Sequence, residues 1–100
     1  MQASITSRDG NTVIVLNGRF DFNAHREFRE TVEQAVKEAP GKIHVDLAGV
    51  DYLDSSALGM LLMLRDKAKG AGKEVALANA RGAVKQVIDI ANFGKLFALI

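Results

Sequence analysis

The sequence predicts a single α/β domain in which α-helices pack on a mixed β-sheet. Short apolar runs typical of strands alternate along the chain with longer segments whose apolar residues recur at helical spacing. Strands joined through helices pair in parallel, whereas the first two runs are joined by a short turn and predict an antiparallel hairpin. The 100 residues fit one domain over 1–100, in the order β-β-α-β-α-β-α with a possible last strand.

The hairpin is predicted at the start of the chain. Residues 3–7 alternate in polarity and predict an edge strand. Residues 8–11 contain Gly and Asn, which tolerate positive φ, and predict a turn. Residues 12–16 form a β-branched run that predicts a buried strand, and residues 17–21 predict a loop.

A first helix is predicted over residues 23–39. Asp21 or Asn23 is expected to cap its start, and Pro40-Gly41 is expected to end it. Its apolar residues share one face: Phe28, Val32, Ala35, Val36 and Ala39.

The middle of the chain predicts a strand, a tight turn and an apolar helix. The strand covers residues 43–47, and the helix begins at Ser55 and ends at the Gly-rich residues 70–73. Two adjacent serines, Ser55 and Ser56, stand where this helix begins.

The last part of the chain predicts a fourth strand over residues 75–78 and a third helix capped by Asn79. Residues 92–94 break this helix. The periodicity of residues 96–100 does not distinguish a last strand from a docked tail.

Composition excludes several classes of protein. With 13 basic and 12 acidic residues the chain lacks the basic excess of a nucleic-acid binder. It has no cysteine for disulfides or zinc thiolates, which fits a cytoplasmic location. The N-terminus lacks signal-peptide features, and no apolar run approaches the roughly 18–20 residues that cross a bilayer, so direct membrane insertion is not expected.

The chemistry of an enzyme is not evident either. No G-x-S-x-G elbow surrounds the serines, and residues 70–73 are a helix end and not a phosphate loop. His25 and His44 are isolated and match no pattern of metal ligands. We therefore expect no catalytic residue, no metal and no cofactor.

The serines are the strongest remaining candidates. On the simplest interpretation Ser55 is the N-cap, worth about 1 kcal/mol, and Ser56 is the first helical residue. The helix follows a parallel strand, at the end where α/β folds usually place sites. Three aspartates, Asp46, Asp51 and Asp54, are expected close to the turn, so a phosphate would add roughly two negative charges to an acidic patch.

The helix after the serines carries more large apolar residues than one buried face needs: Leu58, Met60, Leu61, Leu62, Met63 and Leu64. Part of this surface could contact a partner, for which Met is well suited, although a helix buried on two sides would show the same pattern.

Residues 46–59, DLAGVDYLDSSALG, resemble the signature of the STAS domain family, the anti-sigma factor antagonists. Residues 18–21 resemble the family's G-x-(L/F)-D loop, and the resemblance extends over nearly the whole chain. One departure is Ala57, where many members have Gly. The resemblance implies a STAS-like mixed sheet packed by helices.

The resemblance also implies a phosphorylation switch. Ser55 would be phosphorylated by a serine kinase with the histidine-kinase-like ATPase fold, which often doubles as an anti-sigma factor. A PP2C-type phosphatase would remove the phosphate. The unphosphorylated form would bind the kinase and so free a client such as a sigma factor. The expected partner-binding residues are Asp21, Asp54, Ser55, Ser56, Leu58, Gly59, Met60 and Met63.

Two other functions remain open. STAS-like domains also accompany membrane transporters, so the chain could be a soluble accessory subunit, for example of a lipid-transport ABC complex. Some members have been suggested to bind nucleotides near the G-x-x-D loop, so a nucleotide hydrolase that depends on Asp21 is the third possibility.

Overall fold

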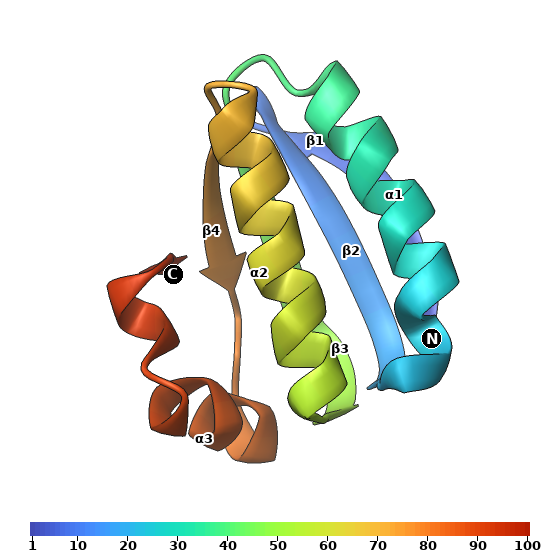
Figure 1. Ribbon diagram of the computed structural model, residues 1–100, viewed down its shortest axis with the longest axis vertical. Coiled ribbons are helices and arrows are strands. Elements are labelled where there is room, and N and C mark those ends of the chain that lie inside the picture. The colour runs from blue at the N-terminus through green and yellow to red at the C-terminus, as the bar shows by residue number, and fades with distance from the viewer.

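The computed structural model describes residues 1–100 and contains one five-stranded sheet in the order β1-β2-β3-β4-β5 (Figure 1). The main elements are β1 Gln2–Arg8, β2 Asn11–Phe20, α1 His25–Glu38, β3 Lys42–Leu53, α2 Ser55–Gly70, β4 Glu74–Ala78, α3 Gly82–Ile90 and β5 Ala98–Leu99. Two 3-10 turns, η1 Phe22–Ala24 and η2 Phe93–Lys95, precede α1 and β5. β1 pairs antiparallel with β2, and all later pairs are parallel, which confirms the predicted class and order.

The helices leave one face of the sheet uncovered. Each parallel connection advances the sheet by one strand in the same direction, and right-handed crossovers then place the helices on one face. α1 and α2 lie next to each other across that face (Figure 1), and residues of all three helices join the sheet in one core cluster of 23 residues. Side chains such as Val13, His44, Asp46 and Ala76 alternate to the opposite side, which we call the uncovered face.

The N-terminal hairpin forms as predicted. Seven residue pairs join β1 and β2, and the turn between them is made by Asp9 and Gly10. Their φ angles of 53° and 82° are the positive values that a type I′ hairpin turn requires at both positions.

Residues 17–20 are part of β2, so the loop predicted there is wrong. They pair with the second half of β3 after two register shifts. Gly49 of β3 fits into this stretch because it has no side chain: a Cβ there would lie 1.8 Å from Oδ1 of Asn17. The local Asn-Gly pattern favours a turn, but pairing with a distant strand overrides it.

β3 is likewise longer than the predicted strand of residues 43–47. It continues to Leu53, and Val50 and Leu53 bury their side chains in the core. The tight turn predicted before the helix therefore shrinks to the single residue Asp54. Both extensions have one cause, because the ends of β2 and β3 pair with each other.

The C-terminal part contains one wrong prediction and one question that the structure settles. Asn79 does not cap the third helix: it has φ 60°, its amide donates to Asp46, and Arg81 precedes α3. Asn92, with φ 59°, lies just after α3, where a break was predicted. Residues 98–99 pair in parallel with β4, so the tail does contain a strand.

Candidate functional site

The first turn of α2 lies at the edge of the sheet where β2 and β3 end together (Figure 1). Phe20 and Leu53 are paired there, and the N–H of Asp54 donates to the carbonyl of Phe20 at 3.3 Å. Asp54 has extended backbone, with φ −110° and ψ −176°, and its Oδ1 accepts a hydrogen bond from the N–H of Ala57 at 3.0 Å. Asp54 is therefore the N-cap of α2.

The expected roles of the serines in capping are wrong by one position. Ser55 is not the cap but the first residue of α2, and Ser56 is the second. Ser55 is exposed, whereas Ser56 is partly buried. A carboxylate caps as well as a hydroxyl and its charge favours a helix N-terminus, so Asp54 takes the cap. The Ser55 hydroxyl is thus not needed to start the helix.

A second carboxylate, Asp21, starts the 3-10 turn η1 at the same edge of the sheet. It accepts a hydrogen bond from the N–H of Asn23 at 3.0 Å, so of the two expected caps Asp21 is correct, although α1 itself begins only at His25. Its other oxygen lies 3.6 Å from Nε of Arg19, and the Arg19 guanidinium carbon lies 4.0 Å from the centre of the Tyr52 ring. These contacts hold the start of η1 against the ends of β2 and β3.

The acidic patch predicted from Asp46, Asp51 and Asp54 does not form. The strand from Asp46 to Leu53 is extended, and a rise of about 3.3 Å per residue places Asp46 roughly 20 Å from the start of α2. Asp51 is exposed and lines a shallow hollow with Arg81. Of the three aspartates, only Asp54 lies directly beside the serines.

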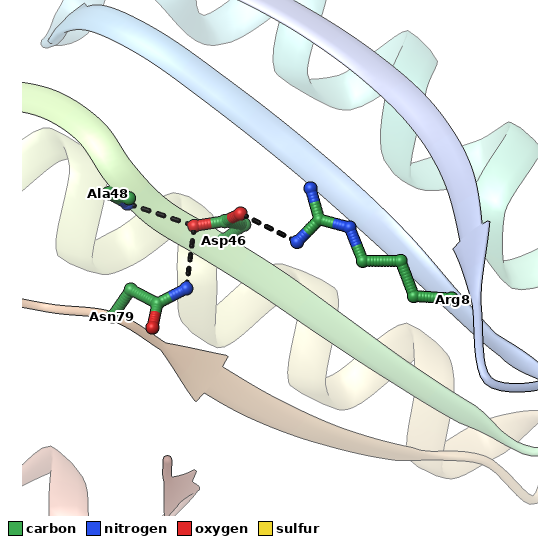
Figure 2. Close-up of polar contacts among 4 residues, drawn as sticks. All are labelled: Arg8, Asp46, Ala48 and Asn79. Carbon is green, nitrogen blue, oxygen red and sulfur yellow. Dashed lines mark hydrogen bonds and ion pairs between the residues drawn. The ribbon is translucent and has the colours of Figure 1, made fainter.

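Asp46 instead links β3 to the end of β1 and to the residue that follows β4, on the uncovered face (Figure 2). Its Oδ1 accepts hydrogen bonds from the N–H of Ala48 at 3.0 Å and from Nδ2 of Asn79 at 3.1 Å, and its Oδ2 accepts from Arg8 at 3.0 Å. Burial raises the pKa of Asp46, but these hydrogen bonds and the charge of Arg8 outweigh it, so the pKa lies below its ordinary value. This cluster is structural and distant from the serines.

The apolar residues of α2 divide between core and surface. Met60 is only 4 % exposed and belongs to the core cluster, so its expected contact with a partner is wrong. Leu58, Leu62 and Met63 are partly buried, and Gly59 is exposed. Leu58, Leu62 and Met63 pack against the core cluster, so only part of each side chain is open to a partner.

One exposed aromatic residue at this edge was missed by the sequence analysis. Phe22 follows Asp21 in η1, and its side chain is 71 % exposed. Large aromatic residues this exposed are enriched at sites of protein–protein contact. Its only signal in the sequence is an apolar residue between a capping aspartate and the first helix, which is compatible with burial as well as with exposure.

Other parts of the chain show no rival site of clear chemistry. His44 lies on the uncovered face and lines a hollow of about 270 Å³ with Asp46 and Arg8, away from α2. His25 is exposed at the start of α1. No cluster of three or more His, Cys, Asp or Glu side chains is arranged to hold a metal ion. None of the helices combines the length and apolar character needed to cross a membrane.

Comparison with known families gives one match over almost the full chain. The model of a family described as "Mlab, STAS domain" matches residues 3–100. A STAS-domain containing protein of Pseudomonas aeruginosa is 44 % identical over 97 residues, which cover 96 % of this chain and 95 % of that protein.

Solved structures with the same fold are distant in sequence. An anti-sigma factor antagonist from Mycobacterium paratuberculosis superposes with a TM-score of 0.86 at 20 % identity, over 98 % of this chain and 83 % of the other. The anti-sigma factor antagonist SpoIIAA in its unphosphorylated form superposes with a TM-score of 0.80 at 20 % identity, over 99 % of this chain and 88 % of the other. SpoIIAA of Bacillus in its phosphorylated form superposes with a TM-score of 0.72 at 19 % identity, over 99 % of this chain and 91 % of the other. A sulfate transporter family protein from Wolinella succinogenes superposes with a TM-score of 0.74 at 14 % identity, over 90 % of this chain and 73 % of the other.

Proposed function

The chain belongs to the STAS domain family, and from this premise we propose that it is a binding module switched by phosphorylation of Ser55. The unphosphorylated form binds a serine kinase of the histidine-kinase-like ATPase fold that acts as an anti-sigma factor. Phosphorylation releases that kinase, and a PP2C-type phosphatase restores binding. The chain itself carries out no catalysis.

The observation that supports this proposal most directly is the position of Ser55. It is exposed at the first position of α2, while the neighbouring Asp54 caps the helix. A hydroxyl that the fold does not need is available to a kinase, and a phosphate on it would sit at the positive end of the helix dipole. The modified protein is therefore expected to keep its fold.

The switch follows from what surrounds Ser55. Gly59 is exposed one turn beyond it on α2, Leu58 and Leu62 are partly buried against the core, and Phe22 is exposed at the same edge of the sheet. A partner that covers this surface would have to desolvate a phosphate carrying about −1.5 to −2 charges beside the carboxylate of Asp54. Loss of binding then comes from the cost of burying the added charge and needs no refolding.

The structural relatives support the proposal at the level of the fold. SpoIIAA has been solved in phosphorylated and unphosphorylated forms, and both superpose on this chain over 99 % of its length.

The experiment begins with fractions of the source cell. A kinase is purified by its ability to transfer phosphate from radiolabelled ATP to the wild-type chain, and the modified residue is mapped by mass spectrometry. We expect phosphate on Ser55, no transfer to Ser55→Ala and normal transfer to the matched control Ser56→Ala. Ser55→Asp is expected to bind the purified kinase at least about tenfold more weakly than wild type, because the interface must bury its charge.

Phosphate found on other residues but absent from Ser55 would overturn the proposal. Equal binding of the phosphorylated and unphosphorylated chains to the kinase would overturn the switch, even if Ser55 is the acceptor.

A second candidate function is that of an accessory subunit of a membrane transporter, for example a lipid-transport ABC complex. The fold shared with a sulfate transporter family protein favours it. Stable co-purification with a transporter ATPase, at a level that Ser55→Ala and Ser55→Asp leave unchanged, would support this function over the phosphorylation switch.

A further inference from the structure

The outer side of β1 is an open edge of the sheet. β1 is the first strand in the sheet order, so one of its two sides has no neighbouring strand. The N–H of Ala3 points to this side, because it donates to Oε1 of Glu27 in α1 at 2.8 Å instead of to β2. Backbone groups two residues apart in a strand point the same way, so those of Ile5 and Ser7 also face this side. Their N–H and C=O groups have no strand of the chain to pair with.

β1 lacks the features that normally keep a sheet edge from pairing with another chain. Protected edges are short, bulged, or carry proline or charged side chains. The opposite edge of the sheet is short, because β5 has only two residues. β1 has seven residues, pairs with β2 without a register shift, and has no proline and no charged side chain before Arg8. Only its start is protected, by the contact of Ala3 with Glu27, so an extended segment can add to the rest of the strand.

The side of α1 that borders this edge is acidic. α1 packs over β1 and β2 (Figure 1), and Glu27 lies at the edge because it binds Ala3. At about 100° per residue, Glu38 falls within about 20° of the same side of the helix, about 16 Å further along its axis. Neither carboxylate forms an ion pair, whereas the other two glutamates of α1 pair with arginines. Two negative charges without a cationic partner therefore flank the open edge.

We propose that an extended segment of a partner protein, with basic side chains at alternate positions, adds to the outer edge of β1. Its backbone pairs with Ile5 and Ser7. Alternate side chains of a strand face the same side of a sheet, so every second residue of the segment lies beside α1, where Lys or Arg meets Glu27 and Glu38. This surface is separate from Ser55, which begins α2 on the part of the sheet that contains β4.

A second copy of the chain fits this edge less well than a basic segment. Two β1 strands joined antiparallel are related by a two-fold axis, which keeps both α1 helices on one face of the extended sheet. The acidic sides of the two helices would then face each other, and like charges across an interface oppose association. A basic segment replaces this repulsion by attraction.

The probe is a synthetic peptide as long as β1 in which threonine and lysine alternate, and its matched control has glutamate at each lysine position. Affinity for the full chain is measured by fluorescence anisotropy, and amide exchange is followed by NMR with and without peptide. In the free chain we expect faster exchange at Ile5 and Ser7 than at Thr6, whose N–H faces β2. The lysine peptide should slow exchange at Ile5 and Ser7 at least about tenfold, and the glutamate peptide should leave it unchanged.

Three variants connect binding to the edge and to its charge. Ser7→Pro removes one open N–H at a position where an edge strand tolerates proline, so it should weaken binding of the lysine peptide about fivefold. Glu38→Lys reverses one flanking charge and should also weaken binding about fivefold. The control Glu33→Lys makes the same change about 120° away around α1 and should alter the affinity by less than about twofold at about 0.15 M salt. Urea unfolding establishes that each variant is folded.

Unchanged exchange at Ile5 and Ser7 with lysine peptide at up to about 1 mM would overturn the inference. Equal affinity for the two peptides would also overturn it, as would wild-type affinity of a folded Ser7→Pro or Glu38→Lys variant. If Ser7→Pro does not fold, the exchange pattern and Glu38→Lys decide. Slow exchange at Ile5 and Ser7 in a concentration-dependent dimer without peptide would assign the edge to a second copy and so contradict the inference.

Discussion

Replacement of Asp46 by Asn tests whether the charge of this carboxylate holds the uncovered face together. Asn keeps one acceptor oxygen for the N–H of Ala48 and for Asn79, but it places an amide N–H₂ group opposite Arg8, where both groups donate. The change removes one charge-assisted hydrogen bond, worth about 1.5–3 kcal/mol. The Arg8 side chain is 54 % exposed and can turn to water, so we expect the lower end, about 1.5 kcal/mol.

The pH dependence gives the prediction a second measurement. The pKa of Asp46 is lowered in the folded protein, so its contribution to stability is present above its unfolded pKa of about 3.9 and is lost as the pH falls through the folded value. Urea unfolding of wild type and Asp46→Asn is therefore expected to differ most at about pH 7 and to converge as the pH falls below the lowered pKa of Asp46. Asp51→Asn, at an exposed position, serves as the control and should change stability by less than about 0.5 kcal/mol.

Two results would refute this reasoning. Equal stability of Asp46→Asn and wild type at neutral pH would mean that the ion pair contributes nothing net. A difference that persists unchanged into strong acid would mean that the loss comes from packing or from the amide itself and not from the charge.

The remaining predictions concern the first turns of α2 and its surroundings. Asp54→Ala should lower the free energy of unfolding by about 1 kcal/mol, because it removes the cap. Ser55→Ala should leave the free energy of unfolding within about 0.5 kcal/mol of the wild-type value. The reverse order in urea unfolding would restore Ser55 as the cap. Met60→Ala should cost about 2–5 kcal/mol because its side chain is buried, and the partly buried Met63→Ala should cost clearly less by the same assay. Phe22→Ala should leave stability nearly unchanged, since the side chain is 71 % exposed, but should weaken binding of the purified kinase by tenfold or more if Phe22 is an anchor of the interface; unchanged affinity would remove it from the contact surface.

The sequence predicted where the candidate site lies, but not which residue caps the helix or which side chains are exposed there. The Asp-Ser-Ser sequence before an apolar run located the start of α2 from the chain alone, because capping and helical spacing are local properties. Which residue caps depends on the backbone at the junction: hydrogen bonding to Phe20 holds Asp54 extended, so Asp54 is the cap and the helix starts one residue earlier than it would with Ser55 as the cap. Phe22 could not be ranked from the sequence, because an apolar residue in a loop is as compatible with burial as with exposure.

By itself the sequence determined the α/β class, the order of the elements, the hairpin turn and the resemblance to STAS domains. These follow from periodicity, turn residues and motifs that extend over a few neighbouring positions. Only the tertiary structure decided how far β2 and β3 extend, because residues 17–20 become strand by pairing with a segment about 30 residues away. It also decided that Asp46 pairs with Arg8, 38 residues earlier, and that Met60 lies in the core while Met63 remains partly exposed. Contacts between distant residues set these outcomes, and the local pattern of a sequence does not encode them separately.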